Sequence, residues 1–135
     1  MPYELYAAVE VGGPPWRMVG EILTPFWSAD SRELFGLGKR GGGPPLFGSR
    51  GVPIDCSDGV KARYRQEAAF IARHPGAAGS LHGDTNATWA ELKDAIGDDP
   101  DVLGGPLSAV LARARSLEGL GHAPEQIRVL LWGRW

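Results

Sequence analysis

The fold is decided by the segment Tyr3-Glu-Leu-Tyr-Ala-Ala-Val-Glu-Val11, which lies near the start of the chain. Every odd position from 3 to 11 holds an apolar or aromatic side chain, and the glutamates stand at even positions. A repeat of two residues is typical of a β-strand that buries one face. The run of glycine and proline at 12–15 ends this pattern sharply, because such dipeptides mark turns. We therefore predict a half-buried strand over residues 3–11.

A second strand is predicted at the other end of the sequence, over residues 127–135, which are rich in β-forming side chains. Both faces of this segment are almost entirely apolar, and Arg128 and Arg134 are the exceptions. A strand of that kind is typical of the centre of a sheet, covered by helices on one side. Because the backbone groups of both segments need partners, we expect residues 3–11 to pair with residues 127–134 in one sheet.

Between these strands the sequence predicts three longer helices and a short one at 31–35. The first long helix begins after Ser57, which fits an N-cap, and the second begins at Thr88, which has capping-box spacing to Glu91. The third begins at Pro106, a residue favoured in the first helical turn. Their inward positions, spaced by three and four residues, are Val60, Tyr64, Ala68 and Ile71, then Trp89, Leu92 and Ile96, then Leu107, Val110, Leu111, Ala114 and Leu117. We predict an α+β domain: a small antiparallel sheet that includes the N- and C-terminal strands, with three to four helices packed on one face.

Two segments have weaker patterns. Residues 16–26 fit either another strand or a turn after a hairpin, since Gly20 and Pro25 weaken the strand pattern. Ten of the eighteen residues at 36–53 are glycine or proline, so we predict a long loop there, of the kind that is usually functional or disordered.

The length of 135 residues predicts a single domain over 1–135.

Composition and charge exclude several classes of protein. A net charge of −2 is unsuited to general nucleic-acid binding, so no nucleic-acid partner is expected. No stretch approaches the roughly 18 apolar residues that a membrane span needs. The single Cys56 has no internal disulfide partner, which favours a reducing compartment. We therefore expect a cytoplasmic protein that does not associate with membranes.

Four pieces of the sequence resemble a known family when taken together. They are Arg32-Glu-Leu-Phe-Gly36, Arg50-Gly-Val-Pro-Ile-Asp-Cys-Ser57, the stretch from His82-Gly-Asp-Thr to Leu92, and the closing Ile127-Arg-Val-Leu-Leu-Trp132. In this order they resemble a family of small uncharacterised proteins encoded by bacteriophages, prophages and actinobacteria. The resemblance implies a phage-type accessory protein that binds a host component or a small signal.

Positive charge and glycine amides gather in one part of the sequence. The stretch Gly36-Leu-Gly-Lys-Arg-Gly-Gly-Gly43 lacks the Gly-Lys-Ser/Thr ending of a phosphate loop and runs into two prolines, which argues against a nucleoside triphosphatase. It fits either a plain mobile loop or an anion-binding loop. In the second case, Arg40 and Arg50 would converge on a small anionic ligand beside the helix N-terminus at Ser57.

Cys56, His82 and Asp84 are the residues from which a cysteine enzyme would be assembled. The alternative is structural: Asp55 and Ser57 cap the following helix, Cys56 packs in the core, and His82 with Asp84 closes a turn. The aspartates beside Cys56 would raise the pKa of its thiol and disfavour the thiolate. We therefore predict that Cys56 is not catalytic. The histidines are too scattered along the sequence to predict a metal site.

Our leading hypothesis is a non-enzymatic accessory protein of phage type that binds and modulates a host protein, without a cofactor. A sequestering protein for a small molecule or nucleotide is the second hypothesis, and a small cysteine-dependent enzyme is the third. The predicted binding residues are Arg40, Arg50, Asp55, Ser57, His82, Asp84, Thr85 and Trp135. A terminal tryptophan needs something to hold it, so Trp135 is expected to contact a partner or a second subunit, which leaves a homodimer open.

Overall fold

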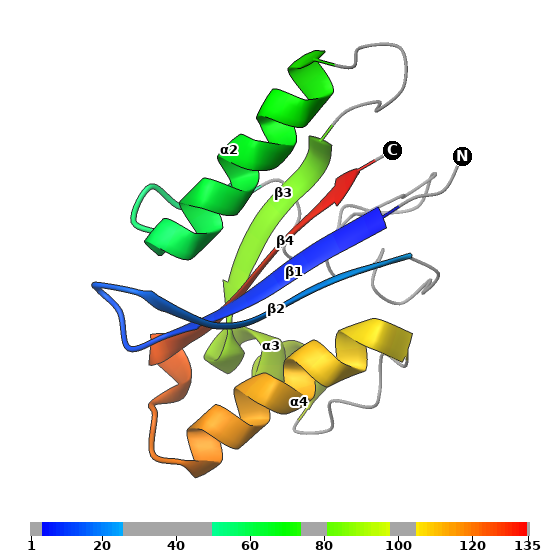
Figure 1. The fold of residues 1–135 in the computed structure, drawn as a ribbon. Helices are drawn as coiled ribbons and strands as arrows, with labels where there is room; N and C mark the ends of the chain where they lie inside the picture. The colour runs from blue at the N-terminus through cyan, green and yellow to red at the C-terminus, as the bar shows by residue number, and fades with distance from the viewer. Residues whose placement is uncertain (1–3, 26–49, 74–80, 98–104, 135) are drawn as a thin grey trace.

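The computed structural model describes residues 4–25, 50–73, 81–97 and 105–134 of the chain. Its strands form one antiparallel sheet in the order β2-β1-β4-β3 (Figure 1). In chain order the elements are β1 (Glu4–Val11), β2 (Arg17–Pro25), α2 (Asp58–Arg73), β3 (Leu81–Thr88), α3 (Trp89–Ile96), α4 (Gly105–Gly119), a short 3-10 turn η2 (Pro124–Gln126) and β4 (Ile127–Arg134). The predicted α+β class is confirmed. The helix expected at 31–35 and residues 36–49 of the expected loop lie outside the described residues.

The predicted pairing of the two terminal strands is also confirmed. β1 and β4 are antiparallel neighbours along their whole length, from Glu4 opposite Arg134 to Val11 opposite Ile127, and they form the centre of the sheet. Residues 17–25 form the strand β2, so the strand, and not the turn, is the correct alternative for residues 16–26. Gly20 is tolerated because β2 is an edge strand whose pairing with β1 has an irregularity next to Val9.

The expectation that all helices pack on one face of the sheet is wrong. α3 and α4 cover one face, and α2 covers the other (Figure 1). The reason lies in β1: its odd positions Leu5, Ala7, Val9 and Val11 are buried with α3 and α4, but Tyr6 and Ala8 are buried as well, on the side of α2. The glutamates at even positions made this second face look solvated, although Glu10 is fully buried.

His82 with Asp84 was expected to close a turn, and this is also wrong, because both residues belong to a strand over residues 81–88. This is the edge strand β3, antiparallel to β4, with an irregularity between His82 and Thr85. The strand is difficult to recognise in the sequence because Gly83, Asp84 and Asn86 are poor strand formers, and pairing with the long apolar β4 stabilises it. The capping box is confirmed directly after the strand: Thr88 and Glu91 exchange both reciprocal hydrogen bonds, each at 3.1 Å.

The inward faces of the helices follow the sequence pattern to different degrees. All five predicted positions of α4 are buried, and so are Trp89 and Leu92 in α3. In α2 the stripe is partly wrong, because Ala68 is exposed and Glu67 is buried in its place. None of the helices within the described ranges is long and apolar enough to cross a membrane.

Candidate functional site

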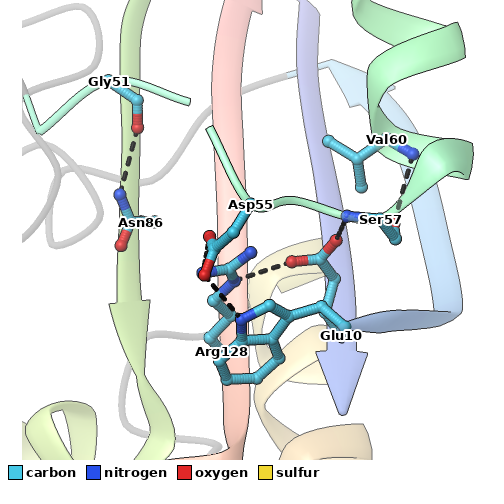
Figure 2. A network of polar contacts seen from close by, with 8 residues as sticks. Glu10, Gly51, Asp55, Ser57, Val60, Asn86 and Arg128 are labelled. Atoms are coloured by element: carbon cyan, nitrogen blue, oxygen red, sulfur yellow. Dashed lines mark hydrogen bonds and ion pairs between the residues drawn. The ribbon is translucent and has the colours of Figure 1, made fainter. Parts of the chain in front are cut away.

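A buried ion pair joins the two central strands on the side of α2. Glu10 and Arg128 stand opposite each other in the register of β1 and β4. The Nε of Arg128 donates to Oε1 of Glu10 at 2.7 Å, and both residues are almost completely enclosed (Figure 2). Opposite residues in an antiparallel pair are close enough for such contacts. The strand pairing therefore brings together two charges that are 118 positions apart in the sequence.

The same glutamate also holds the beginning of α2. Oε2 of Glu10 accepts the backbone N–H of Ser57, and the hydroxyl of Ser57 accepts the backbone N–H of Val60 at 3.3 Å (Figure 2). Ser57 is thus the N-cap that the sequence predicted. A helix N-terminus favours negative charge, and here the chain supplies that charge itself through Glu10. The position at which we expected a bound anion is taken by this carboxylate.

Asp55 and Trp16 complete the network at the surface. Nη1 of Arg128 donates to Oδ1 of Asp55 at 3.0 Å, and the indole N–H of Trp16 donates to Oδ2 at 3.2 Å. The guanidinium of Arg128 also lies 4.0 Å from the centre of the Trp16 ring, which is a cation–π distance. The hydrogen bond from Arg128 lowers the pKa of Asp55. The remaining nitrogen of Arg128, Nη2, is buried and meets no acceptor among the residues that the structure describes.

One apolar side chain projects from this network into solvent. Ile54 precedes Asp55 and is 96% exposed. Trp16, which is bonded to Asp55, is half-buried and follows two exposed prolines of the β1–β2 hairpin. We call Trp16, Ile54 and Asp55 the Ile54 surface. Because Asp55 is bonded to both Arg128 and Trp16, the segment that carries Ile54 is fixed to the central strands.

No match was found in three comparisons with known proteins: no family model, no curated protein and no solved structure matches this chain. The resemblance to the phage and actinobacterial family therefore stays a prediction. Any functional proposal has to rest on the contacts of the chain itself.

A second polar group lies along the edge strand β3 and contains Arg50. Arg50 forms an ion pair with Glu91 at 2.7 Å and donates to the backbone oxygen of Asn86 at 3.3 Å. Gly51 is bonded on both sides of its peptide: its N–H donates to the oxygen of Asp84 at 2.9 Å, and its oxygen accepts from the Asn86 side chain at 3.1 Å (Figure 2). The Arg50 hydrogen bond lowers the pKa of Glu91. This segment is therefore fastened to β3 and α3.

The predicted site residues thus fall into two groups. Asp55 and Ser57 meet in the network of Glu10 and Arg128. Arg50 lies elsewhere, against β3 and α3, where it is bonded to Asn86 and Glu91. The carboxylate of Asp84 accepts the hydroxyl of Tyr64 at 2.7 Å, and Thr85 is fully buried in β3. Arg40 and Trp135 lie outside the described residues, as does the side chain of His82.

Sequence reasoning missed four residues of the site: Glu10, Arg128, Trp16 and Ile54. A signal for the first two was present, because the predicted pairing of residues 3–11 with 127–134 brings a glutamate and an arginine within reach. We read them as solvated residues of an exposed face. No local pattern identifies Ile54, because single apolar residues next to proline or aspartate are common in loops.

Cys56 is part of the smaller apolar core and is only 4% exposed. Burial is the main reason why the pKa of its thiol is raised, and the carboxylate of Glu10 adds to it. Asp55, one of the flanking aspartates that we expected to raise this pKa, has a smaller effect. Within the described part of the chain, no group of three histidine, cysteine or acidic residues could hold a metal ion.

We expect Cys56 to react with iodoacetamide at pH 7 at least about tenfold more slowly than glutathione. A raised pKa leaves less thiolate at neutral pH, and burial restricts access of the reagent. The reaction should accelerate as the pH rises through the range in which an ordinary thiol has already ionised. Labelling followed by mass spectrometry measures both rates. A reaction faster than that of glutathione would contradict the prediction that Cys56 is unreactive and would favour the cysteine-enzyme hypothesis.

Proposed function

We propose that this chain is a non-enzymatic accessory protein of phage type that binds a host protein, in the cytoplasm of the host cell, through the Ile54 surface. The observation that carries this proposal is the position of Ile54, which is 96% exposed on a segment anchored by buried charges. Isolated exposed apolar residues are common on proteins. Ile54 differs because its neighbour Asp55 is held by Arg128 and Trp16, so the backbone that carries the apolar side chain is held in place.

A fixed apolar anchor suits protein binding for two reasons. Burying an isoleucine side chain in a partner's pocket contributes about 1.5–3 kcal/mol. The backbone that carries Ile54 is already held in place, so binding costs little backbone entropy. Trp16 is bonded to the adjacent Asp55, and tryptophan is enriched among the residues that dominate interfaces.

The contacts of the chain support this proposal over the small-anion alternative. That alternative needs Arg50 and the N-terminus of α2 to receive a ligand. Arg50 already pairs with Glu91, and the amide of the N-cap residue Ser57 already donates to Glu10. A phosphate or nucleotide would therefore have to displace a carboxylate of the protein at either position. The buried Cys56, with its raised pKa, likewise favours binding over thiol catalysis.

The experiment compares Ile54→Asp with a matched change at Leu120, which is 75% exposed beyond the end of α4. Tagged protein captures partners from a lysate of the host, mass spectrometry identifies them, and affinity is then measured with the purified partner. We expect Ile54→Asp to weaken binding by roughly ten- to a hundredfold, because it loses the buried apolar contact and places a charge in the pocket. Leu120→Asp should bind like the unchanged protein.

Two results would contradict the proposal. Equal binding by both variants would show that the Ile54 surface is not part of the interface. Binding of inorganic phosphate or a nucleotide by the purified protein, lost on Arg50→Ala, would favour the sequestering protein instead. Circular dichroism of both variants checks that neither change has altered the fold.

A further inference from the structure

The two faces of the sheet are covered by helices of very different character. α4 buries five apolar side chains against the sheet and belongs to the larger core, together with Trp89 and Leu92 of α3. α2 is one residue longer than α4 but buries only Val60 and Glu67. The core beneath α2 is correspondingly small and consists of Tyr6, Ala8, Cys56, Val60, Leu130 and Trp132.

Polar contacts also fasten α2 to the sheet. Oε2 of Glu67 accepts the indole N–H of Trp132 at 2.7 Å, and the hydroxyl of Tyr64 donates to Asp84 on β3 at 2.7 Å. The third contact is that of the Ser57 amide with Glu10. Each of these is a hydrogen bond to one carboxylate, and each would be replaced by water if α2 moved away.

The surface under α2 is aromatic. The rings of Tyr6 and Trp132 stack with their centres 4.2 Å apart, and the ring of Tyr64 meets Trp132 edge-on at 5.1 Å. Tyr6 and Trp132 are almost completely buried. Since both belong to β1 and β4, they would stay in place if α2 opened and the sheet remained paired.

We propose that α2 is a latch that opens as a unit while the sheet, α3 and α4 stay folded, and that its opening exposes Tyr6, Cys56 and Trp132. A segment that opens while the larger core stays intact needs less free energy than global unfolding requires. The paired strands and the larger core lose no contacts with α3 or α4 in this opening. This inference does not depend on the proposed function.

Native-state hydrogen exchange of the full chain in increasing concentrations of urea tests the latch. We expect amides of α2 to exchange through an opening with a smaller urea dependence than global unfolding, because only the surface between α2 and the sheet is exposed. Amides of β1, β4 and α4 should exchange only through global unfolding, with a larger urea dependence. The alkylation rate of Cys56 should follow the amides of α2.

Matched variants separate the latch from global stability. Glu67→Ala removes the acceptor of the buried Trp132 N–H and should accelerate exchange in α2 about tenfold. Its control, Gln66→Ala, changes the exposed neighbouring residue of the same helix and should leave exchange unchanged. Val110→Ala weakens the opposite face and should accelerate exchange in β1 and α4 without changing the opening of α2.

If Glu67→Ala does not fold, Tyr64→Phe provides a milder variant, because it removes only the hydrogen bond to Asp84. The proposal is overturned if α2 exchanges with the same free energy and urea dependence as β1 and α4. It is also overturned if the Glu67 or Tyr64 change accelerates exchange equally in every element.

Discussion

Replacing Glu10 with alanine is expected to lower the free energy of unfolding by about 3–5 kcal/mol, because it leaves a buried arginine without its main partner. Arg128 is 6% exposed, and its Nη2 already has no acceptor among the described residues. Without Glu10, only the solvent-facing Asp55 would remain to balance its charge. The amide of Ser57 would lose its acceptor at the same time. Urea denaturation followed by circular dichroism measures the change.

Asp55→Asn is the matched control, since Asp55 contacts the same guanidinium but its side chain is 53% exposed. Ion pairs at that exposure contribute less than about 1 kcal/mol. The double change of Glu10→Leu with Arg128→Met should recover most of the loss, because an apolar pair of similar size removes both buried charges. A loss below about 1 kcal/mol for Glu10→Ala would mean that water reaches Arg128 and that the network is not buried in solution.

Trp89→Ala is expected to have a comparably large effect, about 3–5 kcal/mol, through the apolar core. Trp89 is fully buried at the start of α3 and packs in the larger core. Its indole N–H also donates to Glu118 of α4 at 2.9 Å, and Lys93 of α3 pairs with the same carboxylate. The substitution therefore creates a cavity and removes one of the bonds that join the two helices. Thermal and urea denaturation both measure it.

Trp89→Phe separates these two contributions, because phenylalanine retains an aromatic ring but has no donor for Glu118. Its loss should be clearly smaller than that of Trp89→Ala. Equal losses for the two variants would show that the hydrogen bond, and not the packed ring, determines the stability of this contact.

Much of the candidate site depends on residues whose sequence context was misleading. Glu10 occupies an even position of an alternating strand, a pattern that usually indicates a solvated face. It is buried because α2 covers that face, and no periodicity within 3–11 predicts where a helix fifty residues later will pack. Residues 81–88 show the same limit, since the strand β3 depends on its partner β4 and not on its own weak propensity.

The sequence alone determined the features that arise from local physical chemistry. Alternation identified β1, helical spacing identified the buried face of α4, and the side chains of Ser57 and Thr88 identified the beginnings of α2 and α3. Each of these depends on residues within a few positions of one another. Only the tertiary structure decided that helices cover both faces of the sheet, that Glu10 meets Arg128, and that Ile54 is held out in solvent. These features depend on contacts between residues far apart in the chain, which form only once the strand register has placed them side by side.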